Sequence, residues 1–214
     1  MVSLNPRISV ALRFVRLLVG LFVYGLGISL MVRASIGIPP WDVLAQGISI
    51  QTHLSFGISQ VLVSVTVLLT WIPLKVKPGI GSILNAVLIG LSTDVWLPLL
   101  PKFDHFIVQI LIFVLGMCVV AFCTGLYISS NFGMGPRDGL VMGTRRKFGW
   151  PVWAIRTVYE SFVLLIGWLL GGQVGLGTVM FAFGIGYLMQ ASLRLFKIEN
   201  KGKAAAQVVA EAEG

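Results

Sequence analysis

The chain has 214 residues, of which 57% are hydrophobic and only 11% are charged. An average soluble domain carries about 25% charged residues, so this composition excludes an ordinary soluble enzyme and indicates a membrane protein. The formal net charge of +8 could suggest a nucleic-acid partner, but the basic residues lie beside the ends of apolar segments rather than in one cluster. Membrane topology accounts for them better, and we expect the lipid bilayer but no nucleic acid as a partner.

Six apolar stretches follow one another along the chain, each about long enough to cross the ~30 Å hydrocarbon core as a helix. They cover residues 11–32, 57–74, 80–100, 106–129, 152–170 and 174–196. The first resembles a signal peptide, but it is too long and lacks an A-x-A-like cleavage site. We therefore expect an all-α polytopic membrane protein with one transmembrane domain, residues 1–198, and a flexible cytoplasmic tail, residues 199–214.

The distribution of basic residues predicts the orientation of the chain. If both termini lie in the cytoplasm, 13 of the 16 lysines and arginines fall in cytoplasmic segments. Only Arg33 and Lys102 then lie outside, and Arg156 lies within a span. By the positive-inside rule this favours an even number of spans with both ends inside.

The second half of the sequence repeats the first at an offset of 96 residues, aligning 20–100 with 116–196 without gaps. Gly37, Pro40, Asp42, Leu44 and Gly47 recur as Gly133, Pro136, Asp138, Leu140 and Gly143. Each half contains three spans, so the second copy enters the bilayer from the opposite side. The sequence predicts two inverted three-helix repeats, at about 15–100 and 105–197, an arrangement common in secondary transporters. Alternatively, the duplication serves only to build a symmetric bundle.

Prolines interrupt both copies at the same place, in "GIPPWDVL" and "GMGPRDGL". Proline cannot continue the preceding helix but suits the first turn of a new one, so we expect short helices at 41–50 and 137–146. Asp42 and Asp138 then lie beside the unpaired N–H groups of these helix starts. Two interpretations stay open at this point: half-helices that re-enter the bundle and face a polar cavity, or loops at the membrane surface.

Charged side chains inside the predicted spans mark a second region of interest. Glu160 lies ~12 Å into its span, where a carboxylate costs on the order of 3 kcal/mol without a partner. Arg156, one helical turn earlier, is the expected partner. The pair is either a fixed structural ion pair, a proton-coupling group, or an anion site at Arg156. Asn85, Asp94 and Gln190 are further polar positions in the spans.

The glycine-rich segments "GIGS" at 79–82 and "GLGT" at 175–178 lack the lysine of a phosphate-binding loop, which argues against ATP binding. We expect them to begin the third and sixth spans instead. Ala86 with Gly90, and Ala182 with Gly186, form small-residue faces at matched positions. We expect the third and sixth spans to pack against each other through these faces.

Cysteine and histidine are scarce. Cys118 and Cys123 lie five residues apart in one apolar stretch, and the two histidines are His53 and His105. This pattern predicts neither a disulfide scaffold nor a metal site, and no cofactor is expected.

The motifs "GIPPWDVL", "FGISQVL", "KPGIGSILNA", "GMGPRDGL" and "GLGTVMFA", in this order over six spans, resemble the YczE/YitT group of bacterial integral membrane proteins. The resemblance covers about residues 15–197. It implies a bacterial inner-membrane protein of transporter-like architecture, nearer the short YczE-like branch because the soluble C-terminal domain of the YitT branch is missing. It implies no particular substrate.

Three functions are compatible with these features. The first is a secondary transporter or exporter of a small anionic or zwitterionic solute, with its site at the midplane. The candidate binding residues are Trp41, Asp42, Asn85, Arg137, Asp138, Arg156 and Glu160. The second is a membrane scaffold linked to a biosynthetic or export system. The third, an intramembrane aspartyl enzyme using Asp42 and Asp138, is disfavoured because neither lies in a Gly-x-Gly-Asp motif. Assembly as a homo-oligomer is left open.

Overall fold

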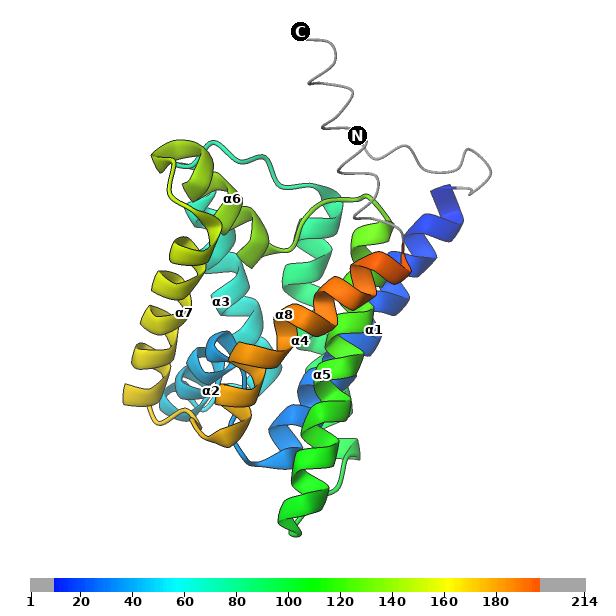
Figure 1. Ribbon diagram of the computed structural model, residues 1–214, viewed down its shortest axis with the longest axis vertical. Helices are drawn as coiled ribbons and strands as arrows, with labels where there is room; N and C mark the ends of the chain where they lie inside the picture. The colour runs from blue at the N-terminus through cyan, green and yellow to red at the C-terminus, as the bar shows by residue number, and fades with distance from the viewer. Residues whose placement is uncertain (1–9, 197–214) are drawn as a thin grey trace, which may run out of the picture.

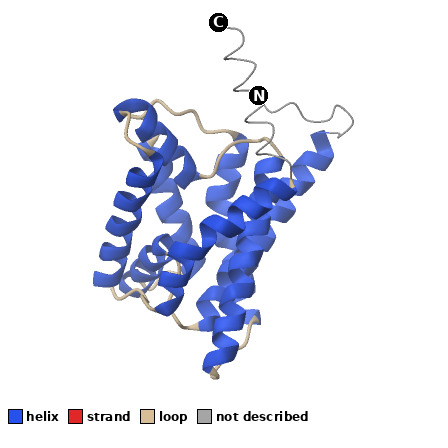
Figure 2. Ribbon diagram, viewed as in Figure 1, coloured by secondary structure: helices blue, strands red, loops and turns tan. Residues whose placement is uncertain are grey.

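The computed structural model describes residues 10–196, and within this range it consists of eight helices and no strand (Figures 1 and 2). The helices are α1 (Val10–Ala34), α2 (Pro40–Thr52), α3 (Phe56–Thr70), α4 (Ile80–Leu99), α5 (Phe106–Ser129), α6 (Pro136–Phe148), α7 (Val152–Leu169) and α8 (Leu176–Leu195). The predicted tail at 199–214 and both chain ends lie outside the described residues.

Five of the helices, α1, α4, α5, α7 and α8, are long and apolar enough to cross a membrane. The chain is thus an all-helical polytopic membrane protein. The remaining predicted span, 57–74, is shorter than expected: α3 ends at Thr70, and Pro73 and the left-handed Lys75 lie in the turn that follows. α3 qualifies as a span only together with α2, from which it is bent by 118°. Five or six spans result.

The structure of the first half recurs in the second half. The helices α1, α2, α3 and α4 start at residues 10, 40, 56 and 80, and α5 to α8 start 96 residues later, at 106, 136, 152 and 176. Left-handed backbone recurs at the same offset, in the pairs Ser35 and Asn131, Gly37 and Gly133, His53 and Gly149, and Lys75 and Gly171. The short helices expected after the prolines are confirmed as α2 and α6.

The centre of the molecule is the packing of α1 against α5, with α4 added to α1 and α8 to α5. Glycines allow the two central helices to approach closely. Gly20 of α1 lies against Tyr127 and Cys123 of α5, and Gly116 of α5 lies against Gly27 and Met31 of α1. Gly116, Tyr127 and Cys123 lie 96 residues after Gly20, Met31 and Gly27, so these contacts are reciprocal between the halves.

The non-helical segments that precede α2 and α6 are each held by the opposite half of the chain. The N–H of Gly177, at the start of α8, donates to the carbonyl of Ile36 at 2.7 Å. The N–H of Gly81, at the start of α4, donates to the carbonyl of Phe132 at 2.9 Å. The glycine-rich segments therefore begin α4 and α8, as predicted, and each hydrogen-bonds to the non-helical segment that precedes the short helix of the other half.

The predicted packing of α4 on α8 is wrong. Although α8 passes in front of α4 in Figure 1, the two helices do not pack against each other. Gly90 instead faces α3, where a side chain would collide with the carbonyl of Gly57, whereas Gly186 has open space around it. A small-residue face permits close approach by a neighbouring helix, but it neither requires such a neighbour nor identifies it.

Alanine at position 90 is expected to destabilise the protein by about 1–3 kcal/mol, because its β-carbon would overlap the carbonyl oxygen of Gly57. The matched control Gly186→Ala places its β-carbon in open space, so only a helix-propensity gain of up to about 1 kcal/mol remains. Thermal unfolding of both variants in one detergent measures the difference. An equal loss of Tm in both would contradict the close packing of α3 on α4.

Candidate functional site

The two short helices place their first residues beside each other. Figure 1 shows α6 near the upper end of the molecule and α2 near the lower end. Both begin with proline, at Pro40 and Pro136, and both carry an aspartate in the first turn. Nη2 of Arg137 lies 3.3 Å from Oδ1 of Asp42, so an ion pair joins the start of α6 to the start of α2.

Asp42 is buried, with 2% of its side chain exposed, and is held by two donors. Nε2 of Gln60 on α3 donates to Oδ1 of Asp42 at 2.9 Å, and Arg137 is the second donor. The N–H groups of the first helical turn add positive potential at the same carboxylate. The guanidinium of Arg137 also lies 5.3 Å from the ring centroid of Trp41, which is its counterpart in the repeat.

The second copy builds the same contact with different chemistry. Nη2 of Arg156 donates to Oδ1 of Asp138 at 3.0 Å, 96 residues after the Gln60–Asp42 contact. This pair is much more exposed, with 44% of the Arg156 side chain and 32% of the Asp138 side chain accessible. The first copy thus buries a carboxylate against an amide and an arginine, and the second presents an ion pair at a surface.

The expected ion pair between Arg156 and Glu160 does not form, although Arg156 lies near enough to act on Glu160 electrostatically. Arg156 forms its ion pair with Asp138 of α6 rather than with Glu160, because α6 lies alongside the first turns of α7. Glu160 has neither an ion pair nor a hydrogen bond with any side chain in the described part of the chain. A carboxylate inside a membrane span needs a counter-charge, a proton or water, so Glu160 is open to a ligand.

These residues line one cavity, with a volume of about 130 Å³. Of the seven residues expected at the site, six line it: Trp41, Asn85, Arg137, Asp138, Arg156 and Glu160. Asp42 lies behind Arg137 and anchors it. The structure therefore brings together residues from α2, α4, α6 and α7 that are far apart in sequence.

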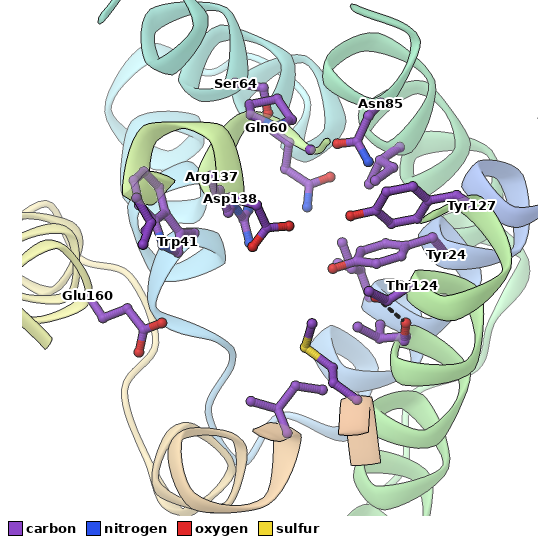
Figure 3. Close-up of a pocket in the computed structure, with 18 of the residues that line it drawn as sticks. Tyr24, Trp41, Gln60, Ser64, Asn85, Thr124, Tyr127, Arg137, Asp138 and Glu160 are labelled. Atoms are coloured by element: carbon purple, nitrogen blue, oxygen red, sulfur yellow. Dashed lines mark hydrogen bonds between the residues drawn. The ribbon is translucent and has the colours of Figure 1, made fainter. Parts of the chain in front are cut away.

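The opposite wall of the cavity consists of residues that the sequence analysis did not select. They are Tyr24 of α1 and Thr124 and Tyr127 of α5. In Figure 3 the hydroxyl groups of the two tyrosines point into the cavity from the side opposite Glu160. Tyrosines in apolar helices usually suggest the membrane interface, so only the packing of α1 on α5 identifies them as cavity residues.

Gln60 leaves an acceptor without a donor in the cavity wall. Its Nε2 is committed to Asp42, so Oε1 faces away from that carboxylate, and this buried oxygen has no hydrogen-bond partner. Figure 3 shows the amide directed into the cavity. An unpaired buried acceptor costs about 1–3 kcal/mol, which a ligand with an N–H or O–H group would recover. Gln60 could have been selected from sequence as the counterpart of Arg156.

The described residues 10–196 contain no cluster of three or more His, Cys, Asp or Glu side chains suited to a metal ion. Cys118 is exposed and Cys123 is buried, both with free thiols. The absence of a cofactor stays a prediction.

Replacing Arg137 by glutamine is expected to destabilise the protein by on the order of 3 kcal/mol, because the buried carboxylate of Asp42 loses its counter-charge. Arg156→Gln is the matched control, and its exposed pair predicts a loss of at most about 1 kcal/mol. Thermal unfolding of both single variants, and of the double variant Arg137→Gln with Asp42→Asn, measures these losses of stability. The double variant should regain stability; equal effects of the two single changes would contradict the assigned burial.

Comparison with known proteins agrees with the membrane fold. A family model described as a family of unknown function, DUF6198, matches residues 11–194. An uncharacterized protein of Haemophilus influenzae is 39% identical over 179 residues, which cover 84% of this chain and 82% of that protein. The uncharacterized membrane protein YczE of Bacillus subtilis is 32% identical over 191 residues, covering 86% and 87%.

A third relative, the uncharacterized protein YyaS of Bacillus subtilis, is 26% identical over 166 residues, which cover 76% of this chain and 83% of that protein. No solved structure matches the chain. The resemblance to the YczE-like proteins, first indicated by the repeated motifs, is confirmed. The chain belongs to the DUF6198 family of membrane proteins and is a relative of YczE.

Proposed function

We propose that the chain is a secondary transporter of the bacterial inner membrane that binds a zwitterionic solute between its two halves. The cavity that contains Arg137, Arg156 and Glu160 is the binding site. In this proposal both termini face the cytoplasm, and the protein acts by binding and conformational change rather than by catalysis.

Reciprocal contacts between the two halves support this proposal, because they favour an inverted arrangement. Contacts between the halves are reciprocal at an offset of 96, as in Gly81 to Phe132 and Gly177 to Ile36. Reciprocal contacts are what a two-fold axis generates. If α2 and α3 together count as one span, each half has three spans, and in this proposal the axis lies in the membrane plane, so that α2 and α6 enter from opposite faces and meet at mid-depth.

The unpartnered groups of the cavity carry the proposal and favour a zwitterion. Arg137 and Arg156 each have an aspartate partner, yet each uses only part of its five N–H donors and can bind an anionic group as well. Glu160 feels Arg156 and Arg137 electrostatically but forms no ion pair and no side-chain hydrogen bond with either, and Oε1 of Gln60 has no donor. A solute with both an ammonium and an acidic group satisfies all four residues, whereas a simple anion would leave Glu160 unpaired.

The two alternative functions account for fewer of these observations. A scaffold needs no cavity, and it gains nothing from an unpaired carboxylate and an unpaired amide oxygen within the membrane. An aspartyl enzyme needs two carboxylates that share a proton. Here Asp42 is bound by Arg137 and Gln60, and Asp138 by Arg156, so each carboxylate already has its own cation.

Binding is tested by the thermal stability of the purified protein with four probes: phosphoethanolamine and glycine as zwitterions, phosphate as an anion and ethanolamine as a cation. A ligand that binds only the folded protein raises Tm. We expect the zwitterions to raise Tm more than phosphate or ethanolamine at equal concentration. Flux of the zwitterion that binds best is then measured in proteoliposomes under imposed ion gradients.

The change Glu160→Gln should weaken zwitterion binding tenfold or more, because a charge-assisted hydrogen bond contributes about 1.5–3 kcal/mol. The control Asp104→Asn removes a carboxylate from the exposed segment before α5 and should leave binding unchanged. If no probe raises Tm and no flux appears while both variants remain folded, the scaffold is the better explanation.

A further inference from the structure

The two halves differ in how their last two helices meet. In the first half, α3 packs on α4, and the N–H of Gly57 donates to Oδ1 of Asp94 at 2.7 Å. In the second half, α7 and α8 do not pack against each other. The counterparts of Gly57 and Asp94 are Trp153 and Gln190, so the second half lacks both the small residue and the carboxylate of this contact.

Individual residues show that the second junction is open. Gly90 cannot accept a β-carbon, whereas its counterpart Gly186 has nothing within 4 Å. The Asp42 side chain is 2% exposed, whereas that of its counterpart Asp138 is 32% exposed. In Figure 1, α7 and α8 diverge from their short connection. The cavity is lined from both α7 and α8, which do not pack against each other, so it opens to the side of the molecule between them, and we name this opening the lateral portal.

The two edges of the lateral portal have opposite character. The α7 edge contributes Arg156, Tyr159 and Glu160 to the cavity. The α8 edge contributes Phe181, Ile185 and Met189, spaced by four residues so that they share one helix face. A polar solute would satisfy only the first edge, and an apolar molecule only the second. The pair of edges fits a molecule with a polar headgroup and an apolar tail.

We propose that the solute is a bilayer lipid with a zwitterionic headgroup of the ammonium–phosphate type, which enters the cavity through the lateral portal. This inference rests on the proposed function, because it assigns the same zwitterion site to the headgroup. The phosphate binds the free N–H groups of Arg137 and Arg156, the ammonium binds Glu160 and Oε1 of Gln60, and the tail lies along α8.

The unpaired amide oxygen of Gln60 further limits which lipid headgroups fit the cavity. It requires a hydrogen to accept, since its own Nε2 already donates to Asp42. A primary ammonium has three N–H donors, as in phosphatidylethanolamine, whereas the trimethylammonium of phosphatidylcholine has none. Phosphatidylglycerol has hydroxyl donors but no cation for Glu160. Phosphatidylethanolamine is therefore the headgroup that this cavity should select.

The inference is tested by photo-crosslinking in vesicles that contain equal parts of phosphatidylethanolamine, phosphatidylcholine and phosphatidylglycerol. A benzophenone amino acid replaces Ile185, or Met189 as a second position should the first variant not fold. The same probe at Ile89, the counterpart of Ile185, lines the cavity from the α3–α4 side, where the two helices pack closely, and is the matched control for the position of the tail. Phe183, 76% exposed on the outer face of α8, samples the bulk lipid. Mass spectrometry identifies the attached lipids.

We expect the adducts at Ile185 to be enriched at least fivefold in phosphatidylethanolamine relative to those at Phe183, and Glu160→Gln to abolish this enrichment. Ile89 should yield fewer lipid adducts than Ile185, because the proposed tail lies along α8 and not along α4. If the adducts at Ile185 have the same lipid composition as those at Phe183, the headgroup selection is overturned. If neither Ile185 nor Met189 yields a lipid adduct, the lateral portal is overturned. If phosphoethanolamine still raises Tm in that case, the proposed transporter of a soluble zwitterion stands and only the lipid inference falls.

Discussion

The ion pair between Arg137 and Asp42 is the contact on which the arrangement of the site depends, because it joins the first turn of α6 to the first turn of α2. Proline at the first position of each helix frees the chain from the preceding span, and the break of each half is then held by the glycine-rich helix start of the other half. Neither half can form this site alone. Burial of the Asp42 carboxylate costs desolvation free energy, which is offset by the arginine, the amide and the helix dipole that converge on this carboxylate.

The difference between the halves matters as much as their similarity. Gln60 and Arg156 occupy equivalent positions and bind equivalent aspartates, yet the amide keeps one free acceptor and the guanidinium keeps free donors. A perfectly symmetric cavity would present the same group twice and would suit a symmetric ion. The asymmetric cavity presents donors and acceptors side by side, which is what recognition of a zwitterion requires.

The sequence predicts the helix breaks well because proline and glycine act locally, and their recurrence at one offset separates them from chance. It fails where a partner comes from another helix. Helical spacing pairs Glu160 with Arg156, but α6 brings Asp138 closer to that arginine. Gly90 and Gly186 look alike in sequence, and only the packing shows that one meets Gly57 and the other meets nothing. Tyr24 and Tyr127 become cavity residues only through the packing of α1 on α5.

A binding site shared between two inverted halves requires that α2 and α6 enter the membrane from opposite faces. This is tested most directly by labelling single cysteines at Thr52 and Lys147, exposed residues at the far ends of the two helices, after replacement of Cys118 and Cys123. A membrane-impermeant maleimide applied to intact cells should label position 52 only, and applied to inverted vesicles should label position 147 only. Labelling of both positions from the same face would contradict the inverted arrangement and the shared site built on it.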